Sequence, residues 1–210
     1  MLNVIIADDH PLIREGFRRI LESEIDLKVV SEASNGEELL RLVRNNVPGL
    51  VIMDLSMPGR HGLDVLQELK LEFPGLPLVI VSMHPEERFA VRAIRLGASA
   101  YLTKESAPQE LVKAVRIVMG GQKYITSKVG SQLANAIGDS NARLLHESLS
   151  NRELQVLCLL ASGRSTRDIS KELYISANTV HTYRARILEK LSLKSNVDLS
   201  LYALRNNLIE

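Results

Sequence analysis

The chain has 210 residues, of which 45% are hydrophobic and 24% charged, an ordinary balance for a globular protein with one large or two small domains. Its 26 basic and 25 acidic residues leave a formal net charge of +1, so overall charge does not indicate a nucleic-acid partner, and any basic surface must be local. The single cysteine, Cys158, excludes an internal disulfide and is most simply a small buried hydrophobe within the run VLCLL.

Membrane insertion and export are not expected from this sequence. No apolar run is long enough to cross a bilayer. The N-terminal apolar segment has no basic start and reaches charge at Asp8, which argues against a signal peptide. Together with the lone cysteine, these features predict a cytoplasmic protein.

From residue 1 to about 122, short apolar segments alternate with longer helical patterns. The apolar segments, rich in Val, Ile and Leu, are predicted strands at residues 2–7, 28–32, 49–55, 76–82 and 98–103. Helical periodicity marks residues 12–21, 36–44, 63–71, 87–96 and 108–119. At least three strands are apolar nearly throughout, as expected when a sheet is covered on both faces. The α/β alternation predicts a five-stranded parallel, doubly wound sheet with helices on both sides.

The alternation ends at Gly120-Gly121. Residues 123–146 then carry many small polar side chains and no strong period, which predicts a linker with one short helix. Beyond the linker the pattern is purely helical, with predicted helices at residues 150–162, 165–173, 177–191 and 195–207. The chain is therefore predicted to consist of a domain at residues 1–122, the linker, and a small all-α domain at residues 147–210.

Polar residues stand at the carboxyl ends of four predicted strands. Asp8 and Asp9 follow the first strand, and Asp54 ends the third. Ser82 ends the fourth strand, and Lys104 follows the fifth. These ends form the ligand-binding edge of an open parallel sheet. Three neighbouring carboxylates need a hard cation such as Mg²⁺, and a carboxylate in such a site can accept a phosphoryl group whose charge the cation and an ammonium neutralise.

Each of these residues also has a structural explanation when taken alone. Asp8 and Asp9 could cap the following helix, and Asp54 could simply end its strand. The coincidence of five such residues at matching strand ends favours a site. His10 and His84 lie near these ends, but a ligand role is disfavoured for both, and His84 is better interpreted as tuning the access of water. A phosphatase with an aspartyl intermediate is an alternative, although short loops leave it no substrate pocket.

Four stretches of the first domain are typical of one family: VIIADDH at residues 4–10, VIMDLSMPG at 51–59, VIVS at 79–82 and ASAYLTK at 98–104. On these stretches the domain resembles the receiver domain of two-component response regulators. The resemblance implies that Asp54 is the phosphoacceptor, with Lys104 and Ser82 beside the phosphoryl group. The implied Mg²⁺ ligands are Asp8, Asp9, Asp54 and the backbone carbonyl of Ser56.

The same resemblance implies a coupled switch between two strand residues. The hydroxyl of Ser82 would move toward the phosphoryl group while the ring of Tyr101 turns inward. Spacing alone does not single out Tyr101, whose simpler interpretation is a half-exposed strand aromatic. The chain departs from many receivers after the lysine, where Glu105 replaces proline, so a cis-proline cannot shape that loop.

The helical domain has the pattern of a helix-turn-helix. Ser150 and Glu153 form a predicted capping box, and Ser176 is a suitable N-cap for the third helix. A small core is predicted from nine apolar residues: Leu154, Val156, Leu157, Leu160, Ile169, Leu173, Val180, Ile187 and Leu191. A short turn separates the second helix from the third, at residues 177–191, which would enter the major groove of DNA.

Local charge supports a DNA contact by this helix, because residues 181–194 contain four Lys or Arg residues against Glu189 alone. By helical angle Thr182 and Ala185 point outward, and such small or polar side chains allow close approach to base edges. His181 and Arg186 flank them, and flanking cations suit phosphates. A helical interaction domain that never contacts DNA is the alternative.

Stretches LSNRELQVL at residues 149–157, ASG at 161–163, DISKEL at 168–173, SANTVHTY at 176–183 and KL at 190–191 resemble the LuxR-type helix-turn-helix. With the receiver, the whole chain resembles a NarL/FixJ-type response regulator. This implies a phosphorylation-controlled transcription regulator rather than an enzyme, with a sensor histidine kinase, promoter DNA and a second copy of the chain as partners. The predicted DNA contacts are Thr179, His181, Thr182, Arg184, Ala185, Arg186, Lys190 and Lys194. His181 stands where many members have a lysine that contacts DNA, and the base specificity of the family cannot be carried over to this chain.

Overall fold

The structure is a computed structural model that describes residues 1–138, 145–206 and 208–209. The chain divides into two compact units, Met1–Gln132 and Leu133–Glu210. Residues 139–144 of the predicted linker and residue 207 of the last predicted helix lie outside the described residues. Among the helices that are described, none is long and apolar enough to cross a membrane.

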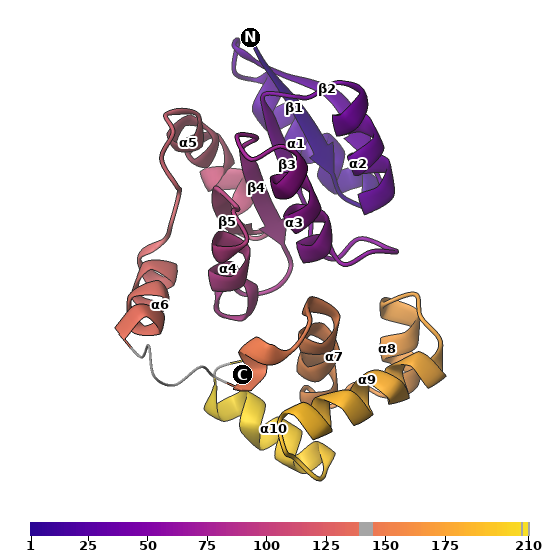
Figure 1. Ribbon diagram of the computed structural model, residues 1–210. Coiled ribbons are helices and arrows are strands. Elements are labelled where there is room, and N and C mark those ends of the chain that lie inside the picture. Colours follow the sequence, from indigo (N-terminus) through magenta and orange to yellow (C-terminus); the bar gives the residue numbers. More distant parts are fainter. Residues whose placement is uncertain (139–144, 207, 210) are drawn as a thin grey trace. The chain divides into compact units, whose positions relative to one another are not determined.

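The first unit contains a five-stranded parallel sheet in the order β2-β1-β3-β4-β5 (Figure 1). Its strands are β1 (Leu2–Ala7), β2 (Leu27–Ala33), β3 (Leu50–Met53), β4 (Leu78–Ser82) and β5 (Ala100–Thr103). Its main helices are α1 (Pro11–Glu22), α2 (Gly36–Asn45), α3 (Gly62–Glu72), α4 (Glu86–Arg95) and α5 (Ala107–Met119). The predicted fold class is confirmed, and each predicted strand and helix of this region is present.

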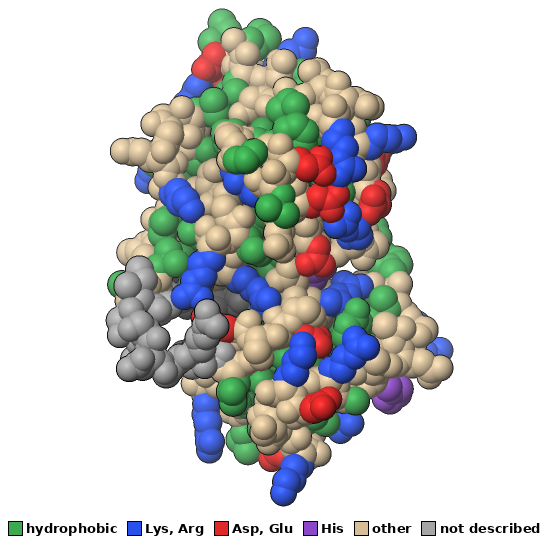
Figure 2. Space-filling model, in the orientation of Figure 1, with side chains coloured by type: hydrophobic (Ala, Val, Ile, Leu, Met, Phe, Trp, Pro, Cys, Tyr) green, Lys and Arg blue, Asp and Glu red, His purple; other side chains and the backbone are tan. Residues whose placement is uncertain are grey.

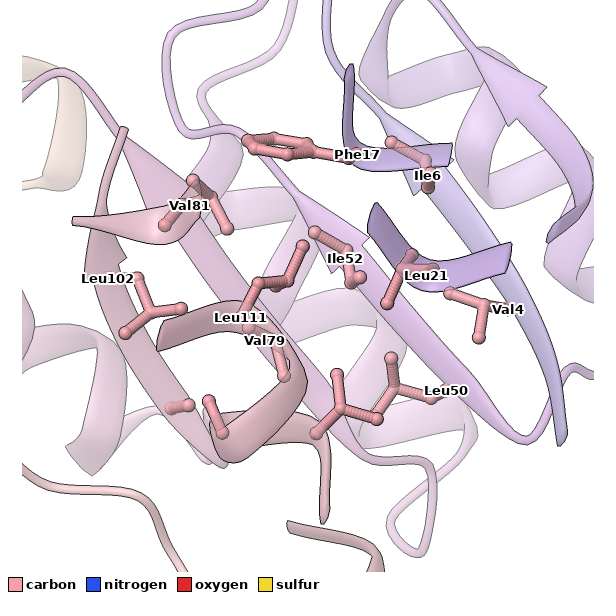
Figure 3. Packing of buried hydrophobic residues seen from close by; sticks show 14 of the residues in the cluster. Val4, Ile6, Phe17, Leu21, Leu50, Ile52, Val79, Val81, Leu102 and Leu111 are labelled. Atoms are coloured by element: carbon pink, nitrogen blue, oxygen red, sulfur yellow. The ribbon is translucent and has the colours of Figure 1, made fainter. Parts of the chain in front are cut away.

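Both faces of the sheet are covered, which explains why its strands are apolar nearly throughout. On one face, inward side chains of the strands pack against Phe17 and Leu21 of α1 and Leu111 of α5 (Figure 3). The alternate strand positions, such as Ile5 and Ile80, are also buried, beneath the helices of the opposite face (Figure 1). Fully burying one such aliphatic side chain contributes roughly 1.5–3 kcal/mol, so this double-sided core fixes the strand ends rigidly.

The segment after α5 continues along the outer edge of the sheet. The backbone N–H of Tyr124 donates to the carbonyl of Ser99 at 2.9 Å, and Tyr124 forms a parallel bridge with Ala100. The hydroxyl of Thr126 donates to the Glu86 carboxylate at 2.5 Å, at the start of α4. Residues 122–126 therefore cover the free edge of β5 and connect it to α4, before helix α6 (Ser127–Gly138) begins.

The second unit contains four helices after a short 3₁₀ turn at Leu145–Ser148. They are α7 (Asn151–Ala161), α8 (Thr166–Glu172), α9 (Ala177–Lys190) and α10 (Asn196–Arg205). The predicted capping box of Ser150 and Glu153 is present, and Ser176 caps α9. All nine predicted core residues are buried. The four-helix arrangement predicted from the sequence is confirmed, with α8 and α9 forming the helix-turn-helix.

Candidate functional site

The neighbouring strands β1 and β3 bring Asp8 and Asp54 to the same edge of the sheet. The backbone N–H of Asp54 donates to the carbonyl of Ala7 at 2.9 Å, and that of Asp8 donates to Ala33 at 3.1 Å. These bonds extend the sheet pairing just past the strand ends. Both carboxylates are 1% exposed, whereas Asp9 is half-buried. The neighbouring strands thus bring two buried carboxylates and the partly exposed Asp9 together in one acidic pocket.

Lys104 lies between the two buried carboxylates. Its Nζ is 2.6 Å from Oδ2 of Asp8 and 2.7 Å from Oδ2 of Asp54. Its backbone N–H donates to the carbonyl of Ser82 at 2.8 Å, which places the loop after β5 against the end of β4. The backbone N–H of Ser56 donates to the other oxygen of Asp54 at 3.1 Å. The residues expected at the strand ends are therefore brought together.

Burial and charge act in opposite directions on this group. Burial raises the pKa of Asp54, and the Lys104 ammonium opposes this shift without cancelling it. Burial alone would lower the pKa of Lys104, but Asp54 and Asp8 outweigh it, so the pKa of the ammonium lies above its usual value. The lysine is therefore charged at neutral pH, and burial makes the ionised form of Asp54 costly, a cost that the ammonium only partly offsets.

Three carboxylates face one ammonium, and this excess of negative charge fits a divalent cation. Ligand atoms of Asp8, Asp9, His10 and Asp54 all lie within 4.8 Å of one another. The oxygen-rich set is typical of a Mg²⁺ site, because Mg²⁺ prefers carboxylate and carbonyl oxygens. The exposed ring of His10 instead lies against the aspartates, with Nδ1 2.8 Å from Oδ1 of Asp9.

Two loops beside the pocket are joined through His84. The backbone N–H of His84 donates to the Ser82 hydroxyl at 3.2 Å, and its carbonyl accepts from the Tyr101 hydroxyl at 3.0 Å. Tyr101 is 2% exposed, so its ring lies inward rather than half-exposed. The His84 ring contacts Phe89, with centroids 4.9 Å apart, and its Nε2 is 3.1 Å from the Ser56 hydroxyl. No spacing in the sequence indicated this link.

In the second unit, the predicted DNA-contact residues differ in what they already contact. His181, Thr182, Ala185, Arg186 and Lys194 are exposed. The hydroxyl of Thr179 is instead 2.7 Å from that of Ser176 in the cap of α9. Nε of Arg184 donates to Asn196 at 2.7 Å, which ties α9 to the start of α10. The outward face of α9 therefore retains small polar groups and Arg186 for a partner.

Lys190 lies at the end of α9 and pairs with α7. Its Nζ is 2.7 Å from Oε2 of Glu153, whose side chain is 4% exposed. Burial tends to raise the pKa of Glu153, but Lys190 and the capping contacts of Ser150 outweigh it and hold the pKa below its usual value. The capping box predicted Glu153, but nothing in the sequence pattern predicted its partner on α9.

Charges of both signs are mixed on the surface that Figure 2 shows. On this face, Lys and Arg side chains lie among Asp and Glu side chains. On the first unit, an example is the network in which Arg44 and Arg60 both pair with Glu68. This agrees with the near-zero net charge, and it makes local geometry on α9 the better guide to a DNA contact.

Comparison with known proteins matches both units to characterised families. The response regulator receiver domain matches residues 4–116, and the luxR family of bacterial regulatory proteins matches residues 147–203. Response regulator UvrY of Escherichia coli K12 is 38% identical over 209 residues, covering 99% of this chain and 96% of UvrY. Response regulator GacA of Pseudomonas aeruginosa is 38% identical over 211 residues, covering 100% and 99%.

A solved structure extends the similarity to three dimensions. RcsB of Salmonella enterica serovar Typhimurium, bound to the rprA promoter with the phosphomimetic BeF₃⁻, is 28% identical with a TM-score of 0.63. The match covers 96% of this chain and 98% of RcsB. The two family matches identify a transcription factor rather than a phosphatase. The chain belongs to the two-component response regulators that join a receiver domain to a LuxR-type DNA-binding domain.

Proposed function

We propose that Asp54 accepts a phosphoryl group from a partner histidine kinase and that this modification controls DNA binding by α9. The proposal assigns residues 1–122 to the receiver, 123–146 to the linker and 147–210 to the DNA-binding domain, all acting in the cytoplasm. The observation that carries it is the contact of Lys104 with the buried carboxylates of Asp8 and Asp54. A structural ion pair requires one carboxylate, whereas a site for a cation and a phosphoryl group requires several.

The chemistry follows from the positions of the charges. One carboxylate oxygen of Asp54 attacks the phosphorus, an acyl phosphate bond forms, and the bond from phosphorus to the donor nitrogen breaks. The Lys104 ammonium, which pairs with Asp54 at rest, is within reach of the phosphoryl oxygens. A bound Mg²⁺ would supply further charge neutralisation at those oxygens. Its proposed ligands are Asp8, Asp9, Asp54 and the carbonyl of Ser56.

The contacts of His84 support a route from the phosphoryl group to the rest of the receiver. Ser82 and Tyr101 both bond to the backbone of His84, one to its N–H and the other to its carbonyl. The proposed switch requires the Ser82 side chain to move toward the phosphoryl oxygen to which it donates, and this movement breaks the bond that its hydroxyl accepts from the His84 N–H. The β4–α4 loop is then free to shift, and Tyr101 shifts with it. These two residues are the proposed switch.

The proposed DNA surface is the outward face of α9 and its flanks. It comprises Thr179, His181, Thr182, Arg184, Ala185, Arg186, Lys190 and Lys194. The N-terminal part of a recognition helix reads base edges, and flanking cations bind phosphates. RcsB dimers have been solved on DNA, and a dimer is likewise proposed here. The exposed apolar side chains of Val197, Leu201 and Leu204 on α10 support a contact between two copies on DNA.

The test compares wild type with Asp54→Asn after incubation with a small phosphoryl donor and Mg²⁺. Wild type is expected to gain the mass of one phosphoryl group in a bond that hydroxylamine cleaves, because an acyl phosphate is labile to that nucleophile. Asp54→Asn should gain none. Asp64→Asn, which removes a carboxylate of α3 outside the pocket, is the matched control and should behave as wild type.

DNA binding is measured on the same three proteins. Sheared DNA from the source organism is captured by each protein and sequenced, with and without the phosphoryl donor. The donor should increase the recovery of a defined set of promoter fragments for wild type and Asp64→Asn, but not for Asp54→Asn. If Asp54→Asn is still phosphorylated, Asp54 is not the phosphorylation site. If all three proteins recover the same DNA with and without the donor, phosphorylation does not regulate DNA binding.

A further inference from the structure

Arg14 of α1 connects the acidic pocket to strand β2. Its Nη1 donates to the backbone carbonyl of Asp8 at 2.6 Å, and its Nε donates to Oε2 of Glu32 at 2.9 Å. The Arg14 side chain is 16% exposed and that of Glu32 24%, so water screens their interaction only partly. Neither residue is among the proposed ligands of the cation or the phosphoryl group.

The carbonyl that Arg14 contacts belongs to the peptide bond between Asp8 and Asp9. The orientation of this peptide sets the direction of both side chains, and both are proposed cation ligands. On the other side of Asp8, its N–H is held by the carbonyl of Ala33. Arg14 therefore completes the fixation of the backbone at the point where the two ligand residues meet. A hydrogen bond from a charged guanidinium is roughly twice as strong as one between neutral groups.

Glu32 fixes the orientation of the guanidinium. Burial alone would raise the pKa of Glu32, but bonds from Arg18 and Arg14 outweigh it, and the pKa lies below its usual value. Glu32 is therefore ionised at neutral pH. A planar guanidinium can serve a carboxylate and a carbonyl at a fixed angle, which a lysine ammonium cannot reproduce.

We propose that Arg14 is a positioning residue for the divalent cation, acting through the Asp8–Asp9 peptide. This inference rests on the proposed function, in which those aspartates hold Mg²⁺. Arg14 does not touch the cation or the phosphoryl group; it limits the directions in which the two carboxylates point. Partners that orient metal ligands commonly change metal affinity by about 10- to 100-fold when replaced.

The chain offers a matched control in Arg18, one turn further along α1. Its Nε donates to the other oxygen of Glu32 at 2.9 Å, so it shares the same carboxylate as Arg14. No bond joins Arg18 to the backbone of Asp8 among the described contacts. Loss of Arg18 thus removes an ion pair between α1 and β2 but leaves the pocket contact in place. A purely structural role would give both variants the same effect.

The experiment titrates Mg²⁺ into the full-length protein and follows the backbone amide resonances of the pocket by NMR. This readout reports binding without phosphoryl transfer. Arg14→Gln is expected to weaken Mg²⁺ binding about tenfold, whereas Arg18→Gln should stay within about twofold of wild type. Arg14→Lys keeps the positive charge but loses the planar guanidinium, so its Mg²⁺ affinity should lie between those of Arg14→Gln and Arg18→Gln. Thermal unfolding without Mg²⁺ establishes that each variant is folded.

The possible outcomes separate this inference from the proposed function. If wild type shows no Mg²⁺-dependent shifts at Asp8, Asp9 or Asp54, both the proposed cation site and the role of Arg14 fail. If wild type binds Mg²⁺ but Arg14→Gln and Arg18→Gln bind it with equal affinity, only the role of Arg14 fails. If Arg14→Gln does not fold, the test is made with Arg14→Lys. The inference is overturned if folded Arg14→Lys binds Mg²⁺ as tightly as wild type does.

Discussion

At the scale of single residues, the pocket depends on an unusual balance of charge. Lys104 is the ammonium that pairs with two carboxylates, each 1% exposed. Buried ions lose much of their hydration, and their mutual attraction offsets this loss only when the geometry is good. Removing one partner leaves the remaining charges buried and uncompensated. In the absence of a divalent cation, Lys104 is therefore expected to stabilise the receiver as well as to assist phosphoryl transfer.

Lys104→Met is expected to lower the free energy of unfolding by about 3 kcal/mol at neutral pH without Mg²⁺. Burial already raises the pKa of Asp54, and loss of the ammonium raises it further. Because the folded-state pKa exceeds the unfolded one, the ionised carboxylate penalises folding as pH rises, and the defect should shrink as pH falls. Urea unfolding at neutral and mildly acidic pH measures the loss in free energy of unfolding that Lys104→Met causes. Lys28→Met, at an exposed position of β2, is the control, and equal midpoints for the two variants would contradict the expectation.

Sequence reasoning reached the pocket because strand ends in a parallel sheet meet at one edge. That rule placed Asp8, Asp54 and Lys104 together without any knowledge of loop conformation. It did not predict the contact of His84 with Ser56, because both lie in loops whose paths depend on packing. Long side chains pose the same difficulty, since spacing along one helix does not indicate which carbonyl on another element a guanidinium will reach.

At the scale of elements, periodicity predicted the core strands and helices well, since burial on one or both faces leaves a clear pattern. Three strands, β3, β4 and β5, are shorter than their apolar runs; β4, for instance, begins at Leu78 although the run begins at Leu76. Hydrophobic residues continue beyond the point at which strand pairing stops. The segment around Tyr124 could not be predicted from the sequence. It contacts the sheet through a single bridge to β5 and one buried ring, and so few contacts leave no periodic pattern of hydrophobic residues.

The contact of α9 with α7 gives a pH-dependent prediction. Glu153→Gln keeps the capping box, for which Gln is suitable, but loses the charge that pairs with Lys190. We expect a loss of about 1 kcal/mol at neutral pH, because solvent at the lysine end weakens the pair. The folded-state pKa of Glu153 lies below its usual 4.5. The additional free energy of unfolding of wild type over Glu153→Gln is therefore fully present above pH 4.5, and it is lost as the pH falls through the lowered pKa of Glu153.

Hydrogen exchange of the α7 and α9 amides in the full-length chain measures this difference. Exchange should be faster in Glu153→Gln than in wild type at neutral pH, after correction for intrinsic rates, and the two should converge in acid. Glu172→Gln, at an exposed site on α8, serves as the control and should match wild type throughout. A difference between Glu153→Gln and wild type that persists unchanged in acid would mean that the ion pair is not its source.

At the scale of the whole molecule, a net charge of +1 does not attract DNA over a distance, so we expect affinity to come from a few local cations and from the proposed pairing of two copies. Each phosphate contact releases counterions, which makes binding steeply dependent on salt. Arg186 on the exposed face of α9 is placed for such a contact, whereas Arg205 lies near the end of α10.

Arg186→Ala is expected to weaken binding to specific and nonspecific DNA alike and to reduce the slope of log affinity against log salt by about 1. Fluorescence anisotropy with a recovered promoter fragment, at several salt concentrations, measures both quantities. Arg205→Ala removes the same charge outside the recognition helix and should leave the slope unchanged. An unaltered slope in Arg186→Ala would place the phosphate contacts on other residues.

The bridge between Tyr124 and β5 has a practical consequence for isolating the receiver. A sheet edge with unpaired backbone groups is a template for pairing with another chain, and proteins usually cover or charge such edges. A fragment that stops at Gly121, where the strand–helix repeat ends, would bare the backbone that Tyr124 now covers at Ser99 and Ala100. It would expose a surface prone to aggregation that the full chain conceals. A fragment ending at Gly138 keeps this cover together with the whole of α6 and is the sounder choice for crystallisation or NMR.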